Sequence, residues 1–183
     1  MGSIDDVDAI RVTGVWYRHT RPDHTTPYWY GHQRRSGRWQ RNDVVRGIYL
    51  AASEDTAWRE WYRLLAEDGI PPKDAVPRAL WRVTVDLPDI ANLSTAARLR
   101  RAGLNAPLRP ARGDWPDYQD AGHALWRAGH TGVLAPSAAG GSGKPGKSLC
   151  IFWPDETVVP GIVDYELVRV VDDPPPPPRG LRT

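Results

Sequence analysis

The sequence predicts a single α+β domain built from short, mixed sheets. Segments typical of strands and of helices follow one another without the regular alternation of a doubly wound sheet. The length of 183 residues suits one domain, and hydrophobic residues make up 40% of the chain, which is enough to form a core. We expect the folded unit at residues 11–171, after a loose acidic leader at 1–10. A disordered tail is expected at 172–183, because it contains five consecutive prolines.

The expected strands are short and apolar. The first, Val12–Tyr17, leads into a stretch at 21–43 that is rich in Pro, Gly, Arg and aromatic residues. An irregular loop of this length in a small domain is usually functional. The later strands are expected at Gly47–Ala51, Leu80–Leu87, Gly132–Ala135, Ser148–Trp153 and Tyr165–Val171.

The clearest helical pattern follows Ser53, a residue that is favourable as an N-cap. Gly69 and the two prolines after Ile70 end the pattern. Between these limits, apolar residues recur at helical spacing, at Ala57, Trp58, Trp61, Leu64 and Leu65. Two further helices are expected at Ser94–Ala102 and Asp117–Ala128.

The composition argues against several classes of protein. One cysteine, Cys150, permits neither a disulfide within the chain nor a cysteine-based zinc site. No apolar run is long enough for a transmembrane helix, and the acidic N-terminus lacks the apolar region of a signal peptide. We therefore expect a soluble protein without membrane contact in a reducing compartment, most simply a bacterial-type cytoplasm.

The charge is balanced overall but uneven along the chain. The formal net charge of +2 is too small to indicate a nucleic-acid-binding protein. Between Arg11 and Arg46, however, eight arginines face two aspartates, and the whole chain holds nine tryptophans. These residues suit a pocket for an aromatic, phosphorylated ligand, because arginine grips phosphate with two parallel hydrogen bonds. Solvated arginines and core tryptophans would give the same composition.

Residues Gly141–Ser148 match the pattern GxxxxGK[ST] of a phosphate-binding loop. Such a loop needs a helix after it, whereas strand-like residues follow here, and Pro145 lacks an amide that would face the phosphate. We interpret the segment as a flexible hairpin loop. A P-loop nucleotide-binding enzyme remains an alternative, as does a non-catalytic binding module that uses the N-terminal arginines. The five histidines show no metal-ligand spacing, so no metal site is expected.

Four polar residues are candidates for chemistry. Glu60 lies about a quarter-turn from the centre of the Trp58, Trp61 and Leu64 stripe, at the border between core and surface. It could equally form an ordinary surface pair with Arg63. The other three candidates are Arg38, Tyr49 and Ser137. They could equally be a solvated arginine, a core tyrosine and a turn serine.

Five short motifs follow one another along the chain. They are Tyr17-Arg18, Gly37-Arg38-Trp39-Gln40, Ile48-Tyr49-Leu50-Ala51, Thr56-Ala57-Trp58-Arg59-Glu60-Trp61 and Ala135-Pro136-Ser137-Ala138. Taken in this order, they resemble the RES-domain family, which is named for an Arg, a Glu and a Ser. The resemblance covers about residues 12 to 170 and assigns these roles to Arg38, Glu60 and Ser137. It also makes Tyr49 the active-site tyrosine and Arg18 a recurring arginine.

The resemblance implies a fold similar to ADP-ribosyltransferase toxins, with NAD⁺ as substrate and no separate cofactor. It also implies that the protein is the toxin of a type II toxin–antitoxin pair. An Xre-family antitoxin would cover the active site, and the toxin could oligomerise through it. Family members cleave NAD⁺ by phosphorolysis or hydrolysis, or transfer its ADP-ribose to a protein.

The resemblance also suggests how the site residues would divide the work. Glu60 would face the positive charge that develops on the ribose. Arg38 and Arg18 would hold the pyrophosphate. The ring of Tyr49 would pack against nicotinamide or its ribose, and Ser137 would hydrogen-bond the ribose. Two tryptophans, Trp39 and Trp58, would line the pocket.

Overall fold

The computed structural model describes residues 3–28, 36–104, 112–139, 146–154 and 159–177. The strands in this part of the chain are β1 (Ala9–Thr20), β2 (Arg46–Ala51), β3 (Arg78–Asn92), β4 (Gly132–Pro136), β5 (Lys147–Trp153) and β6 (Ile162–Val171). Its helices are α1 (Glu54–Asp68), α2 (Ala96–Arg101) and α3 (Trp115–Arg127), with short 3-10 turns η1 (Ile4–Asp6), η2 (Pro72–Asp74) and η3 (Arg112–Asp114). The predicted α+β class is confirmed.

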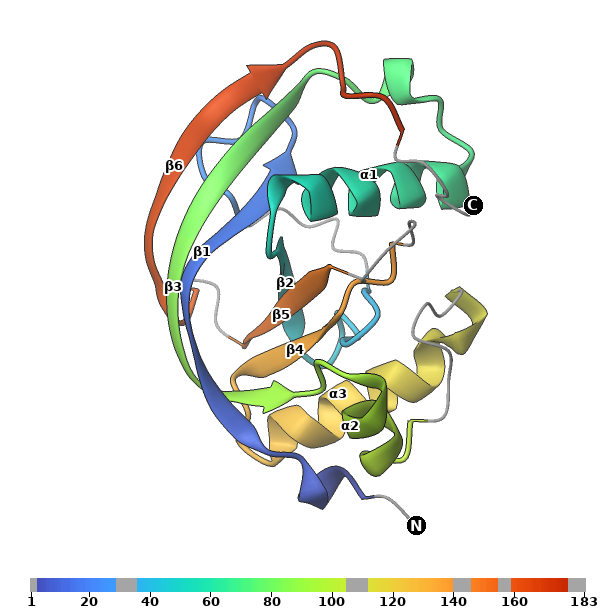
Figure 1. Cartoon of the computed structure of the whole chain (residues 1–183), viewed down its shortest axis with the longest axis vertical. Coiled ribbons are helices and arrows are strands. Elements are labelled where there is room, and N and C mark those ends of the chain that lie inside the picture. The colour runs from blue at the N-terminus through green and yellow to red at the C-terminus, as the bar shows by residue number, and fades with distance from the viewer. Residues whose placement is uncertain (1–2, 29–35, 105–111, 140–145, 155–158, 178–183) are drawn as a thin grey trace.

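The sheet closes on itself. Its strands follow the order β1–β2–β5–β4–β3, and β3 pairs back with β1, so five strands form a barrel-like ring. The sixth strand, β6, pairs only with the other side of β3. β3 and β4 run parallel, and the other neighbours are antiparallel. In Figure 1, β1, β3 and β6 form a long curved wall, and β2, β5 and β4 lie on its concave side.

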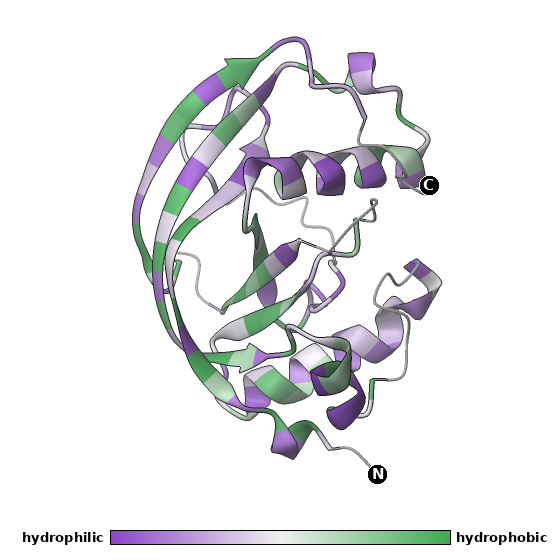
Figure 2. Cartoon of the chain, viewed as in Figure 1, coloured by the Kyte–Doolittle hydropathy of each residue, from purple (hydrophilic) through white to green (hydrophobic). Residues whose placement is uncertain are grey.

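β1 and β3 are longer than their local sequence predicts. They pair antiparallel from Ala9 opposite Ala91 to Thr20 opposite Ala79. Every second residue in this part of β3 is buried in the core, and the residues between them are less buried. The buried residues are Trp81, Val83, Val85 and Leu87. Figure 2 shows this alternation of hydrophobic and hydrophilic residues along β3.

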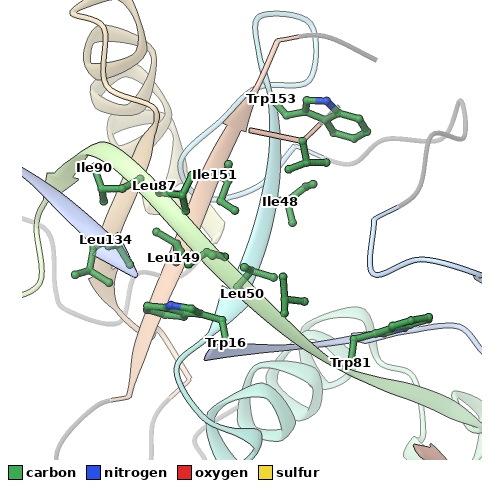
Figure 3. Packing of buried hydrophobic residues seen from close by; sticks show 14 of the residues in the cluster. Trp16, Ile48, Leu50, Trp81, Leu87, Ile90, Leu134, Leu149, Ile151 and Trp153 are labelled. Atoms are coloured by element: carbon green, nitrogen blue, oxygen red, sulfur yellow. The ribbon is translucent and has the colours of Figure 1, made fainter. Parts of the chain in front are cut away.

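The main core joins the curved wall to the inner strands. Trp16 and Trp81 come from β1 and β3, and they meet Leu50, Leu149 and Ile151 of β2 and β5 in one buried cluster (Figure 3). A second cluster covers the other face of the inner strands, where α2 and α3 pack. The inner strands are therefore buried on both faces, which explains why they are almost uniformly apolar.

α1 follows the predicted limits closely. The Ser53 side chain accepts a hydrogen bond from the amide of Thr56, and Gly69 ends the helix with a φ of 65°, a left-handed conformation that suits glycine. The other two helices also form, within two residues of their predicted ends. No helix among the described residues is long and apolar enough to cross a membrane.

The buried face of α1 differs from the predicted stripe. Trp58, Trp61, Tyr62 and Leu65 are buried, whereas Leu64 is 42% exposed. At about 100° per residue, the centre of this aromatic face lies roughly 150° from Glu60. Glu60 itself is half-buried.

Described residues on either side of the expected folded unit make contacts with it. In the segment expected to be a loose leader, Ile4 and Val7 pack against the second cluster, and Asp8 forms an ion pair with Arg98 (3.0 Å). In the expected disordered tail, residues 172–177 have no regular structure, but the carbonyl of Pro175 accepts a hydrogen bond from the Tyr62 hydroxyl. Residues 178–183 lie outside the described part of the chain. Local composition could not reveal these contacts, because their partners are far away in sequence.

Candidate active site

The motif Gly37-Arg38-Trp39-Gln40 forms a tight turn. The amide of Gly37 donates to the carbonyl of Gln40 (3.0 Å), and Gln119 of α3 donates to the carbonyl of Gly37 (2.8 Å). The hydroxyl of Tyr49 accepts a hydrogen bond from the amide of Trp39 (2.8 Å). A Cβ at position 37 would lie 2.4 Å from that hydroxyl oxygen, so glycine is required for this approach. The turn is thereby fixed from β2 and from α3.

This turn holds Arg38 in a buried position. Its Nη1 donates to the carbonyl of Pro136 (3.0 Å), and its Cζ lies 4.5 Å from the centre of the Tyr118 ring. The Nε and Nη2 atoms are buried and make no hydrogen bond within the described residues. Burial lowers the pKa of Arg38, and the nearby carboxylate of Glu60 acts in the opposite direction. The guanidinium therefore keeps donors for an anion in a site of low polarity.

Ser137 connects Arg38 to Glu60. It follows Pro136, the last residue of β4, and its hydroxyl donates a hydrogen bond to Glu60 Oε1. The Ser137 hydroxyl oxygen also accepts a hydrogen bond from the amide of Ala139 (3.1 Å), and the Ser137 amide donates to the carbonyl of Gly146 (2.7 Å). The serine is 1% exposed, so these contacts hold the carboxylate firmly against the end of β4.

Arg18 lies on the other side of Tyr49. Its Nη1 donates to the main-chain carbonyl of Tyr49 (2.8 Å). This contact links β1 to β2, which pair at one position, Tyr17 opposite Ala51. Burial lowers the pKa of Arg18 to about 10 and raises that of the Tyr49 phenol. Arg18 is charged and Tyr49 is neutral near pH 7.

The two tryptophans predicted to line the pocket are core residues. Trp39 is fully buried and stands edge-on to Tyr118, with ring centres 5.0 Å apart. Trp58 is 5% exposed and packs against His19 and Trp61. The Trp39 ring also lies against Arg38, whose Cζ is 4.8 Å from the ring centre.

The loop that matches a P-loop does not have the structure of one. Lys147 and Ser148 begin strand β5, so no helix N-terminus follows the motif. Residues 141–145 of the motif lie outside the described part of the chain. Within the described residues, no group of three or more His, Cys, Asp or Glu side chains could hold a metal ion.

Tyr118, Gln119 and the carbonyl of Pro136 hold the Arg38 turn, and the sequence did not suggest them. Tyr118 and Gln119 come from α3, about eighty residues after the turn. A tyrosine on an amphipathic helix looks like an ordinary core residue, so local sequence carries no sign of its contact with Arg38.

The chain is similar to known proteins. A model of the RES domain matches residues 15–170. A chain in the crystal structure of the M. tuberculosis MbcT–MbcA toxin–antitoxin complex is similar to this one, with a TM-score of 0.66 and 25% sequence identity. The similarity covers 92% of this chain and 88% of that chain. No curated protein matches the sequence.

Proposed function

This chain belongs to the RES domain family, and from that membership we propose that it is a toxin that consumes NAD⁺. The proposed reaction cleaves the bond between nicotinamide and ribose. One observation carries the proposal: Ser137 donates to Glu60 while the adjacent Pro136 accepts from Arg38. Three residues that are far apart in sequence thus meet at the end of β4.

The proposed chemistry needs a carboxylate near the reacting carbon. Nicotinamide leaves as a neutral ring, so its departure needs no acid, and the ribose passes through a cationic, oxocarbenium-like state. The Glu60 carboxylate would stabilise that charge. A preorganised group of this kind contributes a rate factor on the order of 10²–10³. Ser137 orients the carboxylate and could also contact a ribose hydroxyl.

The arginines would bind the phosphates of the dinucleotide. Arg38 keeps two buried nitrogen donors without partners among the described residues, and Arg18 keeps its Nε in the same condition. Charge-assisted hydrogen bonds from these groups suit a pyrophosphate. Tyr49 fixes the Arg38 turn through its hydroxyl, and its ring is partly packed in the second cluster.

The acceptor of the ADP-ribose is phosphate, water or a protein side chain. All three attack the same carbon, so the positions of Glu60 and Ser137 are compatible with each. The antitoxin partner is proposed by analogy with the MbcT–MbcA complex, and we propose that it belongs to the Xre family and covers this site. A fold related to ADP-ribosyltransferases and a cytoplasmic location are parts of the same proposal.

Proton NMR of NAD⁺ tests the proposal. Antitoxin-free protein is expected to release nicotinamide, and parallel samples with and without phosphate separate phosphorolysis from hydrolysis. Glu60→Gln should slow the release by about 10²–10³-fold with the fold intact. Glu166→Gln is a matched control, because Glu166 is an exposed residue of β6 that pairs with Arg82 of β3 (2.6 Å).

Two results would count against the proposal. If the wild-type protein leaves NAD⁺ intact under both conditions, free phosphate and water are not acceptors, and protein ADP-ribosylation would then be the remaining form of the reaction. If Glu60→Gln matches the wild type, the carboxylate does not act at the reacting carbon.

A further inference from the structure

Gly146 belongs to the segment that matches a phosphate-binding loop, and it lies just before β5. A Cβ built on Gly146 would lie 2.7 Å from Cγ2 of Thr56 and closer still to its Oγ1, which is nearer than Cβ atoms approach other groups in proteins. Thr56 is 4% exposed in the first turn of α1, and its hydroxyl oxygen lies 2.9 Å from that of Ser53. The main chain at position 146 therefore rests directly against the helix.

The same glycine holds the residue that follows β4. The carbonyl of Gly146 accepts a hydrogen bond from the amide of Ser137 (2.7 Å), and the hydroxyl of Ser137 donates to Glu60. Thr56 and Glu60 are four residues apart on α1, so they are neighbours on one face of the helix. Two neighbouring residues of α1 thus meet two hydrogen-bonded residues of the connection between β4 and β5.

Main-chain bonds hold both sides of the Gly146–Thr56 contact. Lys147, the next residue, pairs with Pro136 of β4, and its carbonyl accepts a hydrogen bond from the amide of Ala52 (3.0 Å), two residues before α1 begins. Thr56 is short and branched at Cβ, so it has no flexible end that could move aside. A methyl group at position 146 would therefore move α1 and the connection apart by about 1 Å, because non-bonded heavy atoms keep about 3.5 Å between them.

We propose that Gly146 is a positioning residue for Glu60. Its lack of a side chain lets the connection contact Thr56 and hold Ser137 at the same time, and this sets where the carboxylate meets the serine hydroxyl. The role of this glycine in the reaction rests on the proposed function, whereas its effect on the contact between α1 and the connection does not. A misplacement of about 1 Å in an active site can lower the rate about 10²-fold.

Kinetics of NAD⁺ consumption by Gly146→Ala test the proposal. We expect kcat to fall by about 10-fold to 100-fold and the KM for NAD⁺ to change much less, because the arginines proposed to bind the phosphates keep their contacts. Gly113→Ala is the matched control, because a Cβ at this position in η3 would meet nothing within 4 Å. Circular dichroism and the melting temperature show whether each variant is folded.

A second substitution separates this contact from a general loss of structure. Thr56→Ala removes the two atoms nearest to the added methyl group and leaves the Cβ of residue 56 at 3.0 Å from it. The double variant Gly146→Ala/Thr56→Ala should therefore regain most of the lost kcat, and Thr56→Ala alone completes the double-mutant cycle. A wild-type kcat in Gly146→Ala would overturn the proposal, as would a folded double variant that stays as slow as Gly146→Ala. If Gly146→Ala does not fold, a double variant that folds and consumes NAD⁺ supports the proposal, and one that does not overturns it.

Hydrogen exchange at the Ser137 amide, followed by NMR, measures the contact without the reaction. Exchange should be faster in Gly146→Ala than in the wild type and should slow again in the double variant, because the amide donates to the carbonyl of Gly146. If the wild type leaves NAD⁺ intact, the proposed function fails. The exchange rates then decide alone: the expected pattern supports the contact, and equal rates in all variants overturn it.

Discussion

Ser137 makes two hydrogen bonds with one oxygen, donating to Glu60 and accepting from the amide of Ala139. The amide fixes the hydroxyl, and the hydroxyl then fixes the carboxylate. This arrangement suits a residue that positions the carboxylate, because the hydroxyl donates to Glu60 and is itself held by a main-chain amide. The family's serine and glutamate would therefore work as one unit.

Ser137→Ala is expected to lower kcat for NAD⁺ consumption by about 10-fold to 100-fold, since a hydrogen bond to a charged group contributes about 1.5–3 kcal/mol. The KM for NAD⁺ should change much less. Ser94→Ala, which removes a hydroxyl bonded to Asn92, serves as the control. An unchanged kcat in Ser137→Ala would show that Glu60 needs no support from the serine.

His19 predicts a loss of stability in acid. Its pKa of about 3 in the folded protein lies below the ordinary histidine value of 6.5, and burial is the main cause. Between these two pH values the unfolded chain binds a proton that the folded chain does not, so the free energy of unfolding falls as the pH falls. The slope attributable to this group reaches about 1.4 kcal/mol per pH unit.

Urea unfolding at pH 7, 5 and 4 measures this slope. His19→Phe keeps a ring against Trp58, whose centre lies 3.8 Å from that of His19, and should flatten the pH dependence. An equally steep loss of stability in His19→Phe would assign the acid sensitivity to other groups.

Cys150 is expected to be chemically inert in the folded protein. Burial raises the pKa of its thiol to about 12, and the side chain is fully buried in the second cluster. Thiolate is the reactive form, so an aromatic disulfide reagent at pH 8 should not label the native chain within minutes. The same reagent should label one thiol in urea. Rapid labelling of the native chain would show that β5 opens locally.

At the level of secondary structure, the sequence predicted what is encoded locally. Ser53 and Gly69 mark the ends of α1 because a cap and a left-handed residue act on their own backbone neighbours. The extra length of β1 and β3 comes from mutual pairing along Ala9–Thr20, which a local pattern cannot contain. The site shows the same limit: the residue types at 38, 60 and 137 were predicted, but the burial of Arg38 under Tyr118 depends on a distant helix.

Ser53→Ala should lower the melting temperature by about 2–4 °C. The substitution removes the hydroxyl that caps α1, which costs about 1 kcal/mol, and the shift follows for a chain of this size. Ser3→Ala removes the cap of the three-residue turn η1 and should have a smaller effect. Differential scanning calorimetry compares the two variants. Equal shifts would mean that α1 is held by its aromatic face alone.

At the scale of the whole molecule, α1 and α3 lie on either side of the inner strands (Figure 1). Ser137 joins the end of β4 to the middle of α1, and Arg112 joins the turn before α3 to the end of α1. The Arg112 guanidinium contacts Asp68 (2.6 Å) and Glu67 (3.2 Å), and Glu67 also pairs with Arg63 (2.7 Å). Ion pairs thus join the end of α1 to the turn before α3.

Arg112→Ala should loosen the end of α1 without unfolding the protein. Arg112 is 43% exposed, so solvent screens its pairs, and two of them together contribute about 1 kcal/mol. Amide hydrogen exchange in the last turn, including the amide of Ile70 that donates to the carbonyl of Leu65, should speed up about fivefold.

High salt should speed exchange in this turn in the wild type but add little in the variant, because salt screens the same ion pairs. Arg98→Ala, which breaks the pair with Asp8, should leave this turn unchanged. If salt accelerates exchange equally in the wild type and in Arg112→Ala, the ion pairs of Arg112 do not hold the end of α1 in place.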